Sequence, residues 1–275
     1  MNVFGDNRNI GPPGQPGKDA FDIMKWMPMA GVQFYRQQET VNFFFKNETD
    51  GLIFEKNKPT GLKNHGVDKE INGKFLGKKF PKLGRVKNGP YYLLLKDSIF
   101  HIENVQLGTV AASTVVFDLT FKSLKYDRTP SGLFSSNSGS RSLSIFYKTM
   151  YGKEVGIAII KNGAALSEEI EFEPTNWSSI VIQYRVSENG ISYCQWRLND
   201  QFGGVEASSQ PIPEYSLYIG GHPSKNSVNE ALANFEIYFK YGDDELSNEF
   251  MDKYVTLMLE NVEEIDNVLK YSIFV

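Results

Sequence analysis

The stretch VVFDLTFKSL, residues 115–124, sets the pattern that much of the chain repeats. Apolar and polar side chains alternate along it, with Val115, Phe117, Leu119 and Phe121 set against Asp118, Thr120 and Lys122. A period of two residues is typical of a half-buried β-strand, because successive side chains point to opposite faces of a sheet. The stretch therefore predicts a strand with one face in a core.

Further short apolar runs surround and follow it, separated by turn signals rich in Gly, Asn, Ser and Pro. They are SLSIFYKTM, EVGIAII, NWSSIVIQYRV, ISYCQWRLN, YSLYIGG and ANFEIYFKY. Evenly spaced short strands are typical of an all-β sandwich or jelly roll. Alternation within ISYCQWRLN predicts that Trp196 and the single cysteine, Cys194, lie in the core, and that Arg197 points outward.

The order of these runs resembles the laminin G-like, concanavalin A-like jelly roll. The resemblance begins at LGRVKNGPYYLLLKDSIFHIENVQL, residues 83–107, and passes through the strand at 115–124, the NW at 176–177 and the hairpin SYCQWRLNDQ. It ends at FEIYFKY with the following DDELSNEFMDKY, and covers about two thirds of the chain. It implies a two-sheet antiparallel jelly-roll sandwich. That fold carries lectins, glycosidases and adhesion modules alike, so it leaves the function open.

The length of 275 residues and an apolar content of 41% favour one sandwich with appendages over two equal domains. We expect an extended N-terminal tail at residues 1–30, the sandwich at 31–245, and a C-terminal helix and tail at 246–275. Early strands are predicted at VQFYRQ, VNFFFKN and GLIFEKN. The Lys/Gly-rich stretch that follows, up to residue 84, predicts long surface loops.

The last thirty residues change from a period of two to a helical period. Ser247 is a predicted N-cap, with Glu249 in the first turn. Apolar residues then recur every three or four positions, at Phe250, Tyr254, Met258, Val262, Ile265 and Leu269. This stripe predicts an amphipathic helix of roughly six turns that covers one sheet or makes an oligomer contact.

The N-terminal tail contains GPPGQPGKD, with glycine at every third position: Gly11, Gly14 and Gly17. The segment resembles collagen, in which only glycine fits at the axis where three chains meet; a Pro/Gly-rich linker is the alternative. An apolar patch follows directly, in which we expect an oligomer anchor at Phe21, Met24, Trp26 and Met27. Together these features predict a homotrimer.

Charge is unevenly distributed, although the net charge is only -4. From Lys56 to Lys96 there are eleven Lys or Arg and two acidic residues, whereas Glu230 to Asp266 contains eleven acidic residues and two lysines. No aromatic residues are interleaved in an RNA-binding motif, so solvated faces or contacts between subunits are favoured over nucleic acid. The sequence shows no membrane span and no secretory signal, which leads us to expect assembly in a cytoplasm.

The sharpest catalytic candidate is EIEFE, in which Glu169, Glu171 and Glu173 alternate along one predicted strand. The jelly-roll glycosidases use a Glu-x-Asp-x-Glu strand, because alternate carboxylates share one face and can flank a glycosidic bond. Here the middle residue is Glu171 instead of Asp. We interpret the three residues as charges on the solvent face of an edge strand, where charge discourages aggregation.

Metal and cofactor motifs are weak or missing in the sequence. His65, His101 and His222 stand singly, and no pair has the spacing of metal ligands. A run at Asp243, Asp244 and Glu245 fits calcium or a solvated helix N-terminus equally well. We expect no cofactor and no catalytic residue.

The sequence therefore predicts a non-enzymatic head on a trimeric stem, for attachment or decoration at a virion or particle surface, with other surface proteins or a glycan as partner. Loop residues with amides, Arg forks, an imidazole and a tyrosine face suit sugar hydroxyls. The expected ligand-binding residues are Tyr126, Asp127, Arg128, Asn137, Arg141, Asn199, Asp200, Gln201 and His222. The alternatives are a glycoside hydrolase using Glu169 and Glu173, and a minor capsid component without a ligand.

Overall fold

The structure is a computed structural model in which seventeen strands and one long helix are described. It describes residues 39–46, 49, 51–66, 71–87, 90–107, 113–123, 131–136, 143–149, 156–162, 166–173, 175–187, 192–207, 214–220, 229–241, 247–260, 262, 265 and 269. The predicted collagen-like stem and its apolar anchor, residues 11–29, lie outside this part of the chain. All the strand pairs described are antiparallel and form two sheets, as expected for a jelly roll.

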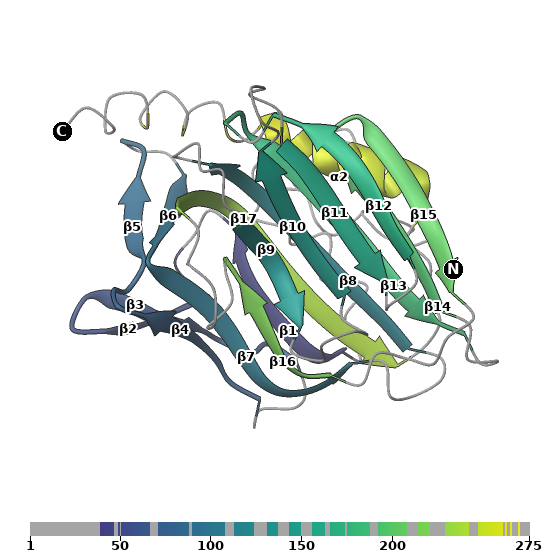
Figure 1. Cartoon of the computed structure of the whole chain (residues 1–275). Helices are drawn as coiled ribbons and strands as arrows, with labels where there is room; N and C mark the ends of the chain where they lie inside the picture. The colour runs from purple at the N-terminus through teal and green to yellow at the C-terminus, as the bar shows by residue number, and fades with distance from the viewer. Residues whose placement is uncertain are drawn as a thin grey trace, which may run out of the picture.

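Eight strands form the first sheet, which we call sheet A (Figure 1). They are β1 (Glu39–Lys46), β5 (Lys82–Arg85), β6 (Tyr91–Lys96), β8 (Ser113–Ser123), β13 (Ser178–Val186), β14 (Ser192–Leu198), β15 (Gln201–Ala207) and β17 (Asn229–Tyr241). Their order is β15-β14-β13-β8-β17-β6-β5, and β1 also pairs with β17. The alternating stretch at 115–124 thus became β8, at the centre of its sheet.

Nine strands form the second sheet, sheet B. They are β2 (Leu52–Glu55), β3 (Lys58–Leu62), β4 (Gly73–Gly77), β7 (Ser98–Leu107), β9 (Ser131–Ser136), β10 (Leu143–Thr149), β11 (Gly156–Asn162), β12 (Leu166–Phe172) and β16 (Glu214–Ile219). Their order is β12-β11-β10-β9-β16-β7-β4-β3-β2. Strands that are distant in sequence, such as β7 and β16, are neighbours in the sheet, which is typical of a jelly roll.

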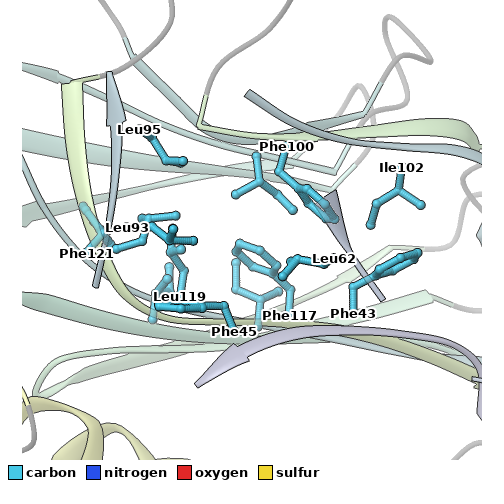
Figure 2. Close-up of a cluster of buried hydrophobic side chains, with 14 of the residues drawn as sticks. Phe43, Phe45, Leu62, Leu93, Leu95, Phe100, Ile102, Phe117, Leu119 and Phe121 are labelled. Atoms are coloured by element: carbon cyan, nitrogen blue, oxygen red, sulfur yellow. The ribbon is translucent and has the colours of Figure 1, made fainter. Parts of the chain in front are cut away.

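The core fills the space between the inner faces of the two sheets (Figure 2). Phe43, Phe117 and Leu119 reach it from sheet A, whereas Phe100 and Ile102 reach it from sheet B. Each large apolar side chain buried in this way contributes roughly 1.5–3 kcal/mol. The predictions for Cys194 and Trp196 are confirmed, because both are buried in the same cluster.

The prediction of long loops in the Lys/Gly-rich stretch is wrong, because β3, β4 and β5 form there. Several of its glycines occupy positions at which any side chain would collide with a neighbouring strand. A Cβ at Gly73 would lie 2.3 Å from Cζ of Phe100, and one at Gly84 would lie 2.2 Å from Cζ of Tyr92. Close packing therefore explains these glycines better than loop flexibility does.

Two further strands include residues of the turn signals that separate the apolar runs. β9 takes in the end of TPSG and the first residue of SNSGS, and β15 begins at Gln201, inside NDQFGG. The turn itself is confined to Asn199 and Asp200, and Asn199 has a positive φ of 51°. Asparagine tolerates this conformation better than most residues do, so a two-residue hairpin turn is sufficient.

The helix α2 (Asn248–Glu260) covers part of the outer face of sheet A (Figure 1). Ser247 caps it as predicted, because the backbone NH of Phe250 donates to Oγ of Ser247 at 3.1 Å. Its apolar side packs on Val116 and Val181. The predicted helix of six turns is interrupted, because α2 ends at Glu260 and a turn at Val262 follows; Ile265 and Leu269 beyond this turn are again helical.

The apolar stripe nevertheless continues beyond the end of α2. Val262, Ile265 and Leu269 are buried against Tyr92 of β6 and against Trp177. These three residues therefore cover a second part of the outer face of sheet A, in addition to the part that α2 covers. Of the two roles expected for the helix, covering a sheet is the one that the structure shows.

Candidate functional site

A strip on the outer face of β14 and β15 lies beside α2, which reaches β14 through the ion pair between Arg197 and Asp252. Cys194, Trp196 and Leu198 of β14 point into the core, so the residues between them point outward. This face carries aromatic, amide and guanidinium groups. We call it the β14–β15 strip, and it consists of Tyr193, Gln195, Arg197, Phe202 and Gly204.

Phe202 is the most prominent residue of the strip, because 68% of its surface is exposed. It lies opposite Arg197 in the strand register, and Cζ of Arg197 lies 5.4 Å from the centre of its ring. Arg197 is itself fixed, since it forms an ion pair with Asp252 of α2 and its Nε donates to the carbonyl oxygen of Asn199 at 3.2 Å. The Phe202 ring is therefore exposed to solvent and is held in a fixed position by Arg197.

Tyr193 forms a second, similar pair at the other end of the strip. It lies opposite Arg185 of β13, whose Cζ is 5.4 Å from the centre of the tyrosine ring. Tyr193 and Arg197 are four residues apart on one face of β14, which corresponds to about 13 Å along the strand. The two aromatic rings thus mark the ends of an elongated surface.

The middle of the strip is polar and open. Gln195 accepts a hydrogen bond from Nε2 of the buried Gln183 at 2.8 Å, which holds its amide in place. Gly204 lies beside it and is exposed. A Cβ on Gly204 would come no closer than 3.4 Å to any neighbour, so packing does not require glycine there. Because Gly204 has no side chain, the surface between the rings of Tyr193 and Phe202 stays uncovered at this position.

Three predicted ligand-binding residues lie at the turn beside Phe202. Asn199 uses its side chain internally, because Oδ1 accepts from the backbone NH of Ser179 at 2.9 Å and Nδ2 donates to Oγ of Ser178 at 3.3 Å. Gln201 donates from Nε2 to the carbonyl oxygen of Glu171 at 2.8 Å, which ties β15 to β12 of the other sheet. Asp200 is exposed at the tip of the turn.

The other predicted site residues lie outside the described part of the chain. For ligand binding these are Tyr126, Asp127, Arg128, Asn137, Arg141 and His222, and for oligomerisation Gly11, Gly14, Gly17, Phe21, Met24, Trp26 and Met27. The sequence alone did not indicate Phe202, because it lies within NDQFGG, one of the turn signals between the apolar runs. A single aromatic residue next to a two-residue turn was the signal that could have found it.

The acidic run lies on β12, at the edge of sheet B, where it was expected. Ile170 and Phe172 point into the core, and Glu171 and Glu173 are exposed. Oε2 of Glu173 accepts from Nδ2 of Asn176 at 2.7 Å, and Oε1 accepts from the Thr175 hydroxyl at 3.4 Å. Glu173 therefore stabilises the local turn. Of Glu169 only the backbone is described.

A second polar group lies on the outer face of sheet B. The ring of His101 stacks on Tyr218 with centres 4.5 Å apart, and its Nδ1 lies 3.5 Å from Oε1 of Glu103. His101 is buried, and its Nε2 has no hydrogen-bond partner among the residues that the structure describes. Burial lowers the pKa of His101, although the Glu103 carboxylate acts in the opposite direction.

Two kinds of feature were searched for among the described residues only. No three His, Cys, Asp or Glu side chains there are arranged to hold a metal ion. No helix among those residues is long and apolar enough to cross a membrane.

Comparison with known proteins relates this chain to others through structure alone. No family model and no curated protein matches the sequence. The receptor binding domain of botulinum neurotoxin mosaic serotype C/D matches with a TM-score of 0.50 at 10% identity, over 80% of this chain and 50% of that one. Another receptor binding domain matches with a TM-score of 0.50 at 11% identity, over 80% and 51%.

The fold is a two-sheet antiparallel jelly-roll sandwich. This confirms the architecture that the order of strands resembled, and the chain spans about half the length of those receptor binding domains. Domain 4 of AbnA, an extracellular arabinanase from Geobacillus stearothermophilus in complex with arabinotriose, is also similar, with a TM-score of 0.49 at 11% identity over 79% of this chain and 98% of that one. At these identities the likeness concerns the fold, so the function must come from the site.

Proposed function

We propose that this protein is a non-catalytic carbohydrate-binding head, and that the β14–β15 strip is its binding surface. The observation that carries the proposal is the Phe202 ring, which is 68% exposed and yet held in place over Arg197. An exposed aromatic ring in a fixed orientation is a ready stacking surface for the apolar face of a sugar, because little entropy is lost when the sugar binds.

The rest of the strip supplies what sugar hydroxyls need. The Gln195 amide lies beside the open Gly204, and Asp200 offers a carboxylate at the turn next to Phe202. Amides and carboxylates form directed hydrogen bonds with hydroxyl groups. The distance of about 13 Å between the Tyr193 and Phe202 positions along the strand is long enough for more than one sugar ring. An oligosaccharide lying along β14 and β15 therefore fits better than a single monosaccharide.

The test is a glycan array probed with the labelled full chain, followed by titration calorimetry on the best glycan. Phe202→Ala should weaken binding by about tenfold or more, since roughly 1.4 kcal/mol corresponds to a factor of ten. Phe80→Ala is a matched control, because Phe80 is also an exposed phenylalanine, at 44%, but lies in the loop between β4 and β5. Unchanged binding by Phe202→Ala would place the site elsewhere.

The loop residues Arg128 and Arg141 provide the second arm of the same experiment. An Arg128→Ala, Arg141→Ala variant tests whether the loops contact the sugar, as the sequence predicted. Loss of binding in this variant, together with full binding by Phe202→Ala, would move the site from the strip to the loops. If the unmodified chain bound no glycan on the array, this result would favour the alternative of a minor capsid component without a ligand.

Catalysis by the acidic run is the alternative from another class of function. Exposure of Glu171 and the use of Glu173 in a local turn support the non-catalytic reading. A retaining glycosidase would need two carboxylates about 5–5.5 Å apart, one of them with a raised pKa. Turnover of a β-glucan by the purified chain, abolished by Glu169→Gln, would establish the enzyme instead.

The proposal extends to the assembly of the whole chain. We propose that the head is carried on a homotrimeric stem at a virion or particle surface, on the basis of the glycine triplets and the apolar patch in the sequence. Light scattering of the full chain should give the mass of a trimer. A monomer at micromolar concentration would refute the trimeric stem, without bearing on the sugar site.

A further inference from the structure

The far edge of the sandwich brings three connections together. The register of β3 with β4, in which Gly61 lies opposite Lys74, places the β2–β3 turn at the end of β4. Gly77 of β4 lies opposite Ser98, which brings the β6–β7 turn to the same end, and Nζ of Lys79 lies 4.0 Å from the Asp97 carboxylate there. Figure 1 shows β2 to β5 on the opposite side of the molecule from β14 and β15.

Positive charge is concentrated in the segments that form this edge. Residues 51–66 and 71–87 contain nine Lys or Arg and a single acidic residue, Glu55. Five of the lysines are exposed in or next to the β2–β3 turn and the β4–β5 loop, and we call them, together with Phe54 and Phe80, the basic rim. The five lysines are Lys56, Lys58, Lys78, Lys79 and Lys82.

Apolar side chains are exposed between these charges. Phe54 is 42% exposed and Phe80 44%, and Ile53 and Leu76 nearby are exposed to a similar degree. Among the described residues, four of the five large apolar side chains that are exposed belong to this edge, and Phe202 is the fifth. Such clustering marks an interaction surface, because isolated exposed apolar residues are otherwise scattered.

We propose that the basic rim docks on the surface of an anionic phospholipid bilayer. Lysines near a membrane are attracted by acidic headgroups, and aromatic or aliphatic side chains beside them can enter the headgroup region. A soluble polyanion would engage the lysines alone and would leave Phe54 and Phe80 in water. The mixture of exposed aromatic rings and lysines therefore favours a lipid surface over a polyanion.

The backbone presents this surface rigidly. Lys56 and Asn57 form the β2–β3 turn with positive φ values of 49° and 63°, the conformation of a tight two-residue hairpin. Phe54 precedes this turn on β2, and Phe80 lies in the β4–β5 loop between Lys79 and Lys82, the first residue of β5. A sandwich anchored through this edge would keep the β14–β15 strip on the side away from the membrane.

The experiment is co-sedimentation of the full chain with vesicles of phosphatidylcholine, with and without phosphatidylserine. We expect binding that requires phosphatidylserine and weakens with salt. A Phe54→Ser, Phe80→Ser variant and a Lys78→Glu, Lys79→Glu variant should each lose about tenfold or more in binding. Phe202→Ala is the matched control and should bind vesicles like the unmodified chain, which separates this surface from the sugar site.

Three results would overturn the proposal. They are absence of binding to phosphatidylserine vesicles, equal binding to vesicles of phosphatidylcholine alone, and full binding by a folded Phe54→Ser, Phe80→Ser variant. Binding to heparin without binding to vesicles would identify a polyanion site instead. Circular dichroism and melting temperature establish that each variant is folded, and Lys78→Gln with Lys79→Gln offers a milder change if charge reversal prevents folding.

Discussion

Tyr254 of α2 and Asp118 of β8 meet in a buried hydrogen bond, in which the tyrosine hydroxyl donates to Oδ2 of Asp118 at 2.5 Å. The two residues are 136 positions apart in the chain. Asp118 lies on the outer face of the central strand and is only 5% exposed. This bond fixes α2 on sheet A at one point, whereas the apolar packing around it is not directional.

Tyr254→Phe should therefore lower the free energy of unfolding by about 1–3 kcal/mol, because it removes a hydrogen-bond donor from a buried carboxylate. Urea denaturation followed by tryptophan fluorescence measures the change. Tyr193→Phe is a suitable control, since that tyrosine is partly exposed on the same sheet. Equal stability of the Tyr254→Phe variant and the unmodified chain would show that this bond adds nothing to docking of α2.

Arg197 allows the stacking support to be separated from the ion pair. Asp252→Asn breaks the ion pair and keeps the guanidinium near Phe202, whereas Arg197→Gln removes both. The Asp252 side chain is half exposed, so we expect Asp252→Asn to cost at most about 1 kcal/mol of stability. Only Arg197→Gln should also weaken glycan binding, as measured by calorimetry. Equal binding by both variants would argue against Arg197 as the support of the ring.

Alanine substitutions at two glycines should differ in their effect on stability. Gly73→Ala places a Cβ 2.3 Å from a ring atom of Phe100, which is in the core, so we expect a loss of about 1–3 kcal/mol from overpacking. Gly204→Ala finds 3.4 Å to its nearest neighbours and should leave the melting temperature nearly unchanged. Thermal unfolding by calorimetry compares the two. A stable Gly73→Ala variant would mean that β4 does not approach β7 as closely as described.

His101 predicts a loss of stability in mildly acidic solution. Its pKa in the folded protein lies below the unfolded value of 6.5, because burial disfavours the charged ring. The unfolded chain therefore binds the proton more readily, and the stability that the neutral ring provides at neutral pH declines as the pH falls from about 6.5 through the folded pKa.

The pH dependence of urea denaturation tests this prediction, and His101→Phe provides the comparison because phenylalanine keeps a ring against Tyr218. The variant should lack the part of the decline that falls between neutral pH and the folded pKa. Superimposable pH profiles for the variant and the unmodified chain would contradict it.

The strands of the sandwich could be predicted from the sequence wherever apolar residues on one face of a strand alternate with polar residues on the other. β8 is the clearest case, because Phe117, Leu119 and Phe121 alternate with polar residues and do face the core. The prediction failed where glycine interrupts the alternation. At β4 the inward position of Gly73 is filled by the ring of Phe100, so the missing apolar residue belongs to another strand, and a local pattern cannot show this.

The candidate site was predicted only in part, for a related reason. The turn at Asn199 was recognised, but its amide binds the neighbouring strand, and the exposed ring of Phe202 lies one residue beyond Gln201. Exposure of an aromatic side chain depends on the end of α2 and on the edge position of β15, neither of which leaves a mark near residue 202. The basic segment, in contrast, was visible as a charge excess before its fold was known.

The only cysteine of the chain gives the molecule a built-in reporter of motion. The Cys194 thiol is completely buried on β14, the strand whose opposite face forms part of the β14–β15 strip. A thiol-specific reagent can reach this thiol only when β14 transiently opens away from the core. The rate of thiol modification therefore reports how often this edge of the sandwich opens. A ligand that spans β14 and β15 would slow the reaction in proportion to its occupancy, and no label needs to be engineered into the protein to observe it.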